Sequence, residues 1–364
     1  MAFKIINLTE DKFQDWDKFC LTSNDAWFWH TTEWLTYILN YKPALATENF
    51  SFFVYRDDKI QAIVPLTREL KKYNNKDIYE FSFGGGDIPI AALNNDLSAN
   101  ERMDLYDFIF KEINRLAMSN QVACIKMRQT PLSINSLRMV NSPNHLLKFG
   151  YTDASFSTQI INFKKKEEEL WNDLRRNHAR NIRKGSIFNI TVYNAENIER
   201  SIFNEYKETH FRAAGRQTRP DKTFELMYYW IKMGLGFLVV VQYQNRNIGF
   251  ECYVMYKNIV SGLSAANDPD YEHLPIRHAL EWNAILWMKK QGVKYYEIGK
   301  QRYGILPYSF PDKKLLDIPH FKRGFGGQAF PLFCVEKYCD KDYFLEIYRE
   351  RMEKFAASFD NDKK

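Results

Sequence analysis

The sequence is poor in cysteine and has no long apolar run, and both absences limit what the protein can be. Its 364 residues include five cysteines, namely Cys20, Cys124, Cys252, Cys334 and Cys339. They are odd in number, scattered and set mostly within apolar runs, which indicates reduced thiols rather than a disulfide framework or a zinc site. No run of about 18 apolar residues occurs, and the first residues lack the apolar segment of a signal peptide. We therefore expect a cytoplasmic protein without a membrane span.

Motifs of several common chemistries are also missing. The glycines at residues 84–86 lack the Lys-Ser/Thr of a phosphate-binding loop, and those at residues 324–327 do not open a dinucleotide-binding βαβ unit. No cluster of histidine and cysteine has metal-ligand spacing, and no Gly-x-Ser-x-Gly elbow occurs. The sequence therefore predicts no metal cofactor and no serine hydrolase.

Length and aromatic content favour an enzyme of two domains. A chain of 364 residues is long for one core. Aromatic residues make up 16% of it, enough for two cores and a stacking site. The formal net charge of +6 is modest and does not by itself select a partner.

The most informative stretch is residues 237–299, because its elements follow a definite order. The pattern predicts three β-strands, a helix and a further strand, at residues 237–244, 248–256, 259–264, 275–290 and 294–298. A turn at residues 245–247 joins the first two strands as a hairpin. Pro275 suits the first turn of the helix, and Gln291-Gly292 ends it.

This order is similar to the core of the GNAT acyltransferases, and the flanks resemble the FemAB-type transferases within that fold. The basic segment at residues 170–185, the glycine-rich ending at residues 321–327 and the segment at residues 29–35 carry the second resemblance. It implies that the strands at residues 259–265 and 295–298 splay apart, with an acyl-CoA between them and its pyrophosphate over the helix start.

An internal repeat supports a duplicated architecture. Residues 52–65 form a second hairpin pattern, followed by a helix near residues 100–118 and a strand at residues 122–127. Pro65 and Pro89 interrupt this copy where strands should continue. We predict an α+β fold of two tandem GNAT-like domains. Residues 1–163 form a degraded copy, and residues 164–364 carry most of the active site.

Acyl transfer to an amine needs a base, an oxyanion donor and an acid. The candidate bases are Glu297, which ends the last strand, and Glu251, which lies mid-strand in an apolar run, with the loop histidine His273 as a weaker candidate. A structural ion pair is the alternative role for each carboxylate. The family resemblance implies oxyanion donors near Ser264 and Ala265, where the strand should bulge. The acid is predicted to be a tyrosine, and Tyr303 is chosen ahead of Tyr256 and Tyr308.

The resemblance also implies sites for two anionic substrates. Donor phosphates should lie near Leu274, Ile276, Arg277 and His278, although the family's Arg/Gln-x-x-Gly-x-Gly/Ala signal is absent from residues 273–278. Acceptor phosphates should be held by arginines of a polar loop and of the basic helix, namely Arg212, Arg216, Arg219, Arg180 and Arg183. The alternative for the basic helix is a solvated face paired with the glutamates at residues 167–169.

The resemblance is strongest to sugar N-acyltransferases that use acyl-CoA and a nucleotide-linked amino sugar, for surface (lipopolysaccharide-type) polysaccharides. A dTDP-linked 3-amino-3,6-dideoxyhexose is the substrate to test first. The alternative enzyme is a FemAB-type transferase that moves an amino acid from aminoacyl-tRNA to a peptidoglycan precursor. A third interpretation, a basic RNA-binding module, lacks interleaved basic and stacking residues. Nucleic acid is therefore expected only as tRNA under the alternative.

Overall fold

The computed structural model describes residues 3–138 and 142–359, which divide into two compact units. Unit 1 comprises the described residues of Met1–Ser157, Arg302–Leu316 and Pro331–Lys364, and unit 2 comprises Thr158–Gln301 and Asp317–Phe330. This division differs from the boundary expected at residues 163 and 164, because part of the C-terminal segment belongs to unit 1. Strand β18 (Cys334–Tyr338) pairs antiparallel with β9 (Val122–Arg128), and the following helix α11 (Lys341–Ser358) packs on the same unit.

Unit 1 contains two sheets. One has the strand order β1 (Lys4–Asn7), β3 (Phe52–Arg56), β4 (Lys59–Val64) and β8 (Ala92–Leu93). The other has the order β10 (Thr152–Asp153), β18, β9, β6 (Lys76–Phe81), β5 (Thr67–Tyr73) and β2 (Glu48–Asn49), and β7 (Ile88–Pro89) also pairs with β9. The helices include α1 (Phe13–Thr22), α2 (Thr32–Tyr41), α3 (Ala99–Ser119) and α4 (Ile134–Arg138).

Pro65 marks the place where the hairpin of unit 1 leaves one sheet for the other. It lies between β4 and β5, which belong to different sheets. Proline has no N–H to donate to a ladder, so a continuous strand through this position would lose a hydrogen bond. Pro89 is tolerated at the end of the short strand β7. The interruption predicted at Pro65 is confirmed, whereas Pro89 lies within β7 and pairs with Arg128 of β9.

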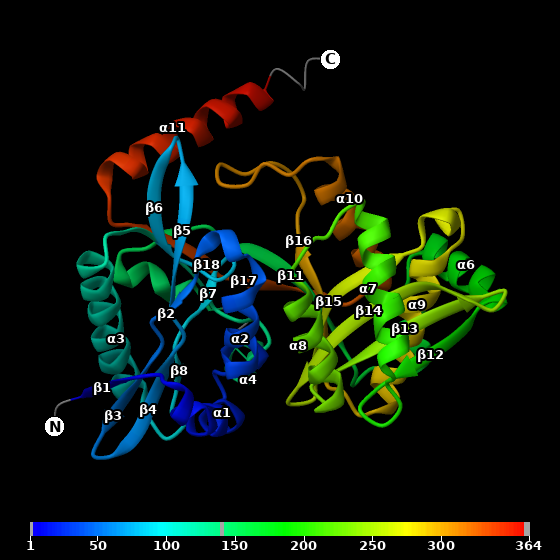
Figure 1. Cartoon of the computed structure of the whole chain (residues 1–364), viewed down its shortest axis with the longest axis horizontal. Helices are drawn as coiled ribbons and strands as arrows, with labels where there is room; N and C mark the ends of the chain where they lie inside the picture. Colours follow the sequence, from blue (N-terminus) through cyan, green and yellow to red (C-terminus); the bar gives the residue numbers. More distant parts are fainter. Residues whose placement is uncertain (1–2, 139–141, 360–364) are drawn as a thin grey trace. The chain divides into compact units, whose positions relative to one another are not determined.

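Unit 2 is built on one long sheet, with the order β12 (Asn189–Tyr193), β13 (Gly236–Tyr243), β14 (Arg246–Tyr256), β15 (Ile259–Asn267), β16 (Tyr295–Gln301), β11 (Phe156–Asn162) and β17 (Gln328–Leu332). Its helices include α5 (Glu167–Asn172), α6 (Arg176–Lys184), α7 (Arg200–Ala214), α8 (Asp221–Lys232), α9 (Ile276–Lys290) and the end of α10 (Lys313–Lys322). Helix α9 packs on one face of the sheet with α6 beside it, and α7 and α8 cover the other (Figure 1). The strands and helix predicted for residues 237–298 are therefore confirmed.

The predicted repeat is visible as one motif that occurs in each unit. In unit 1, α3 connects the parallel strands β6 and β9, and in unit 2, α9 connects the parallel strands β15 and β16. Each unit also has a short 3-10 helix that ends at a glycine with positive φ and leads into a strand, at Gly150 and at Gly326. The fold is α+β with the same strand–helix–strand motif in each unit, as expected from the sequence.

The basic segment predicted as one helix is divided into α5 and α6. The break follows from the glycine-rich ending at residues 324–327. The backbone N–H of Arg175 donates to the carbonyl of Gly324 at 2.9 Å instead of continuing the α5 ladder. A Cβ added at Gly324 would lie 2.2 Å from the His178 ring, and one added at Gly326 would lie 2.6 Å from Cβ of Asp173. These glycines thus let the ending pack directly against the two short helices.

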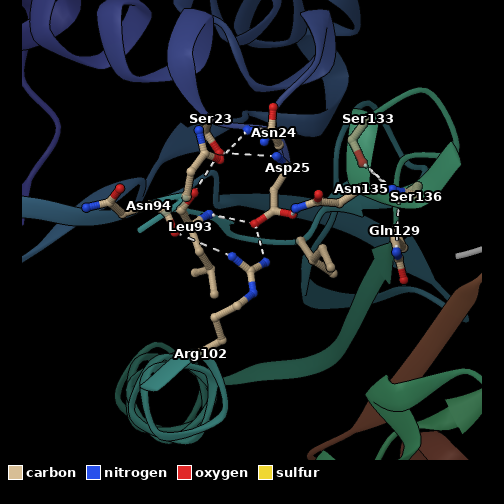
Figure 2. Close-up of polar contacts among 12 residues, drawn as sticks. Ser23, Asn24, Asp25, Leu93, Asn94, Arg102, Gln129, Ser133, Asn135 and Ser136 are labelled. Carbon is tan, nitrogen blue, oxygen red and sulfur yellow. Dashed lines mark hydrogen bonds and ion pairs between the residues drawn. The ribbon is translucent and has the colours of Figure 1, made fainter. Parts of the chain in front are cut away.

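In unit 1, Asp25 holds together a loop, a strand and two helices (Figure 2). Its carboxylate accepts hydrogen bonds from the backbone N–H of Leu93 at 3.1 Å and from the side chains of Arg102 and Asn135 at 2.6 Å each. Ser23 contributes by donating to the carbonyl of Leu93 at 2.7 Å. Because the acidic group already has a cation and two further donors, this cluster is a structural tie.

Candidate active site

The ladder between β15 and β16 ends part-way along both strands. The last of three parallel pairs joins Ser261 to Glu297. Beyond it, β15 continues to Asn267 and β16 to Gln301 without a further pair between them in the described part of the chain. An extra residue at position 263 interrupts the pairing of β15 with β14 immediately after this point. A bulge bends its strand, so it accounts for the separation, and it lies next to the predicted position at Ser264.

Glu297 occupies this last paired position. Its side chain accepts hydrogen bonds from the hydroxyl of Thr158 at 2.7 Å and from the hydroxyl of Ser261 at 3.0 Å. The residue is 9% exposed. Both partners are neutral donors that orient the carboxylate, and no cation of residues 3–138 and 142–359 forms an ion pair with it, which suits a group that must accept a proton.

Glu251 and Glu297, the two predicted bases, lie on opposite faces of the sheet. Neighbouring side chains of a strand alternate between faces. Ser261 contacts Glu297, whereas the Cβ position of the next residue, Gly262, lies 3.2 Å from Oε1 of Glu251. Tyr253 is on the same face as Glu251 and packs in the core under α9. Glu251 therefore faces α9, and Glu297 faces α7 and α8.

A pocket of about 370 Å³ lies at the start of α9. Its walls come from α6, the end of β15, the loop before α9 and α10, through Asn181, Lys184, Asn267, Glu272, His273, Leu274, Pro275, Arg277, His278 and Phe321. Three of the four residues predicted for donor phosphates line it. Ile276 does not, because it is buried in the hydrophobic core. The pocket has the size of a small-ligand site.

The first turn of α9 leaves backbone donors free. Pro275 is the N-cap and supplies no side-chain acceptor. Among the described residues, the backbone N–H groups of Arg277 and His278 have no hydrogen-bond partner. Free N–H groups and the positive end of a helix of 15 residues favour an anion. Burial, together with His178 and Arg277, lowers the pKa of His278 to about 4, so this ring is neutral near pH 7.

Beneath the pocket, a buried ionic network connects α9 to the sheet. Nη2 of Arg277 lies 2.7 Å from Oε2 of Glu251 and 4.0 Å from Oε2 of Glu281. Tyr296 donates its hydroxyl to Glu281, and Tyr253 donates to the same carboxyl at 3.4 Å. Glu281 and the two tyrosines are not among the site residues predicted from the sequence. An acidic residue between Leu280 and Trp282 in an apolar helix was the available signal.

The end of α7 and the loop after it contact β15 and the residue that follows it. Arg212 forms an ion pair with Asp268 at 2.6 Å, and Arg219 donates to the hydroxyl of Ser264 at 3.2 Å. Arg216 is exposed. Ser264 lies opposite Cys252, on the same face as Ser261, so Arg219 shares the face of the sheet to which Glu297 belongs.

The cations of α6 point mainly into solvent. Arg180, Arg183 and Lys184 are exposed, and the Arg183 guanidinium lies 5.2 Å from the centre of the Trp171 ring. Lys184 also lines the pocket at α9. Lys322 of unit 2 lies beside β16. Nζ of Lys322 is 3.1 Å from the Cβ position of Gly299. Tyr303 is 68% exposed and belongs to unit 1.

The glycine loop of unit 1 already contains its own anion. The carboxylate of Glu69 accepts hydrogen bonds from the backbone N–H groups of Gly84 and Gly85 at 2.6 and 2.7 Å and from the Ser82 hydroxyl at 2.5 Å. Glu69 is 1% exposed. Since the loop N–H groups are taken, this part of unit 1 offers no phosphate site.

Within residues 3–138 and 142–359, no group of His, Cys, Asp and Glu side chains is arranged to hold a metal ion. No helix in the same ranges combines the length and apolar character needed to cross a bilayer.

Comparison with known proteins identifies the fold. No protein-family model and no curated protein matches the sequence. Among solved structures, the chain is similar to FemX, with 13% identity, a TM-score of 0.62, and coverage of 95% of this chain and 100% of FemX. It is also similar to L-PGS from Bacillus licheniformis, with 12% identity, a TM-score of 0.53, and coverage of 94% and 96%.

A third similar structure is a tandem GNAT protein from the clavulanic acid biosynthesis pathway. It shares 7% identity with the chain at a TM-score of 0.51, and the match covers 93% of this chain and 99% of that protein. At such low identities the likeness establishes the fold. The fold is that of a tandem GNAT protein, as the sequence analysis predicted.

Proposed function

We propose that the protein is an N-acyltransferase that moves an acyl group from a CoA thioester to a primary amine. The observation that carries this proposal is the end of the β15–β16 ladder at Ser261 and Glu297. There a bulged strand, a buried carboxylate and a helix start with free N–H groups belong to the same strand–helix–strand motif. The likeness to FemX and to a tandem GNAT protein supports the same class of reaction.

Glu297 is the proposed base. Its carboxylate takes a proton from the acceptor ammonium, and the free amine attacks the thioester carbonyl carbon. A C–N bond forms, and the carbonyl electron pair moves to oxygen. Backbone donors alternate along a strand, so one of the adjacent N–H groups of Ser264 and Ala265 faces the unpaired edge and stabilises this oxyanion.

The tetrahedral intermediate then collapses. The C–S bond breaks, the new amide loses its extra proton, and the thiolate leaves as CoA after it takes up a proton. Tyr303 remains the predicted donor of that proton. The donor phosphates are proposed to occupy the pocket at the start of α9. Lys184 and the N–H groups of Arg277 and His278 bind them there.

The proposed acceptor is a nucleotide-linked amino sugar, with a dTDP-3-amino-3,6-dideoxyhexose tried first, used in surface polysaccharide synthesis. Two phosphates of such an acceptor need cations on the face of Glu297. Arg219 and Arg212 provide them near the bulge of β15, and Arg216, Arg180 and Arg183 are the further candidates.

The test is thiol release by the full chain with several acyl-CoAs and a panel of amino-sugar nucleotides. Thiol release that depends on both substrates is expected for at least one pair, and the product must carry the acyl group on nitrogen. If no acyl-CoA releases thiol with any amine in the panel, the CoA-dependent reaction is wrong.

The second candidate is transfer from aminoacyl-tRNA to a peptidoglycan precursor. The observation that favours it is the likeness to FemX, which covers 100% of that chain, together with the exposed cations of α6. The salt dependence of binding distinguishes an aminoacyl-tRNA donor from an acyl-CoA donor. A tRNA complex should weaken steeply with ionic strength, as counterion release requires, whereas CoA binding should weaken mildly.

A further inference from the structure

The carboxylate of Glu297 is held by two hydroxyl groups that come from the strands on either side of it. Thr158 lies on β11 and Ser261 on β15, and β16, which carries Glu297, is between these two strands in the sheet. The Thr158 hydroxyl donates to Oε1 at 2.7 Å, and the Ser261 hydroxyl donates to Oε2 at 3.0 Å. Each carboxylate oxygen therefore has a donor, and the group is fixed from both sides.

The three side chains are buried together. Thr158 is 0% exposed, Ser261 is 5% exposed and Glu297 is 9% exposed. A hydrogen bond in such surroundings is electrostatically stronger than one in water, and solvent competes little for its donor. The two hydroxyls therefore fix the direction of the carboxylate, which an exposed glutamate side chain would not keep.

Two other buried carboxylates are paired with cations instead. Glu80 lies 2.5 Å from Nζ of Lys126. Glu251 lies 2.7 Å from Nη2 of Arg277. A cation favours only the ionised form of a carboxyl group, whereas a hydroxyl can both donate and accept a hydrogen bond. After Glu297 takes up a proton, one of its two hydroxyl partners can turn and accept that proton in a hydrogen bond, so the same pair holds both protonation states.

The hydroxyls also leave acceptor positions on the carboxylate for a substrate. An ionised carboxylate has about four positions at which it can accept a hydrogen bond, and Thr158 and Ser261 occupy two of them. The remaining positions can accept from the N–H groups of an acceptor ammonium. The ammonium then gives its proton to a carboxylate whose orientation is already set, as efficient general-base catalysis requires.

We propose that Thr158 and Ser261 are positioning residues that hold the Glu297 carboxylate in the orientation in which it takes the proton of the acceptor amine. The inference rests on the proposed function, in which Glu297 is the base. Thr158 contributes more than Ser261, because its hydrogen bond is shorter and because a threonine side chain is stiff about χ1. Both residues act through Glu297 and not on a substrate directly.

The experiment is steady-state kinetics of the full chain with the acyl-CoA and amine that give thiol release. The variants are T158V, T158S and S261A. Valine keeps the size of threonine and removes only the hydroxyl. We expect T158V to lower kcat about 10- to 30-fold and S261A about 3- to 10-fold, as hydrogen bonds to a charged group are lost. KM for both substrates should stay within about two-fold of the wild type. T158S keeps the hydroxyl and should recover most of the loss.

A second set of variants separates positioning from a purely structural role. If Thr158 acts through the carboxylate, T158V should cost no more than about two-fold when Glu297 is already replaced by Gln, whereas a structural defect would cost the same factor in both backgrounds. The matched control is Thr67 of unit 1, a strand threonine that is 0% exposed and donates its hydroxyl to the carbonyl of Ser82. T67V should leave kcat and KM of the folded enzyme unchanged, and melting temperatures show that each variant is folded.

The outcomes distinguish failure of this inference from failure of the proposed function. Folded T158V and S261A variants whose kcat equals that of the wild type would overturn the inference alone, as would equal losses for T158V with and without Glu297. An E297Q variant with a rate near that of the wild type would remove Glu297 as the base, and the inference with it. A wild-type chain that releases no thiol with any acyl-CoA and amine would overturn the proposed reaction itself.

Discussion

The strand–helix–strand motif occurs in both units, and only the copy in unit 2 keeps its polar groups available. In unit 1, β6 pairs with β9 from Tyr79 to Phe81, and the short strand β7 then continues the pairing through Pro89 to Arg128, the last residue of β9. In unit 2, the β15–β16 ladder ends at Ser261 and Glu297 and no strand takes over in the described residues. In the first copy, the chain itself therefore supplies the strand that continues the pairing.

The N-termini of the two helices differ in the same way, because α3 is capped by side chains and α9 is not. Ser98 caps α3 and forms a reciprocal capping box with Glu101, so two N-terminal donors are satisfied by side chains. Pro275 leaves the first turn of α9 uncapped beside a pocket. Local capping satisfies the N-terminal donors of α3, whereas the first turn of α9 keeps donors that a ligand could use.

The loops that precede the helices complete the comparison. In unit 1, Glu69 satisfies the backbone donors of Gly84 and Gly85. One topology thus serves as a scaffold where donors are satisfied internally and as a candidate site where they are left for a ligand. Each of the following changes tests that distinction.

The largest effect is expected at Glu297. Replacing it by Gln removes the proposed base and should lower kcat about 10²- to 10⁴-fold, with CoA affinity nearly unchanged. Steady-state kinetics and CoA titration measure the two quantities. The control is Glu80 of unit 1, a buried carboxylate paired with Lys126, for which E80Q should reduce stability and leave kcat of the folded enzyme unchanged. If E297Q keeps a rate within a few-fold of the wild type, Glu297 is not the base.

The second effect is on the stability of unit 1. Removing the Glu69 carboxylate in E69A takes the acceptor from the buried N–H of Gly84, the buried hydroxyl of Ser82 and the part-buried N–H of Gly85, and should lower the free energy of unfolding by about 2–4 kcal/mol. Denaturant unfolding measures the loss. The opened loop should then bind an added anion, so sulfate should raise the melting temperature of E69A more than that of the wild type. Equal sulfate responses would mean that the loop is not a masked anion site.

The third effect is on the acceptor. R219A removes a cation from the face of Glu297 and should raise the acceptor KM about 10- to 100-fold, with little change for the acyl donor. R219K should restore only part of the loss, because the planar fork is missing. The exposed pair Arg115–Glu112 of unit 1 supplies the control R115A. An unchanged acceptor KM in R219A would move the acceptor phosphates elsewhere.

Much of this architecture was predictable from the sequence. Periodicity and turn residues located the strands and helix of residues 237–298, and Pro65 located the break between β4 and β5 in unit 1. The division into units was less accessible, because the pairing of β18 with β9 joins residues more than 200 positions apart. Sequence patterns of short range do not encode such a contact.

The site was predictable as a region and less so in its roles. The order of elements located the end of the pairing between β15 and β16, with Glu297 at its last pair, and anion binding at the start of α9 stays a prediction. The strand pattern did not resolve on which face Glu251 lies, because the bulge near Gly262 shifts the register that relates neighbouring strands. Glu281 was not predicted from the sequence, because the role of an isolated acidic residue in an apolar helix depends on partners that lie on strands elsewhere in the chain.

The smallest expected effect is a pH dependence of CoA binding that arises from Glu281 in unit 2. Burial raises the pKa of Glu281 to about 8, and the negative charge of Glu251 adds to the rise while Arg277 and Lys322 oppose it. Below that pH Glu281 is neutral, and the charges of Glu251 and Arg277 balance. Above that pH, the ionised Glu281 adds a negative charge close to the donor phosphates. CoA affinity should therefore fall about five-fold between about pH 7 and about pH 9. This is the size of effect expected from one unit charge in a partly screened site.

Calorimetric titration of CoA across this range tests the effect, and E281Q is its matched variant. Gln keeps the shape and a hydrogen-bond acceptor for Tyr296 but does not ionise, so E281Q should show a flat profile where the wild type declines. The shift has a second consequence, because a carboxyl with a raised pKa holds its proton longer in the folded state than in the unfolded chain. Its contribution makes the folded state lose stability as pH rises from about 4.5 to about 8, and E281Q should remove that slope as well. Parallel declines in wild type and E281Q would assign the pH dependence to another group and remove Glu281 from donor binding.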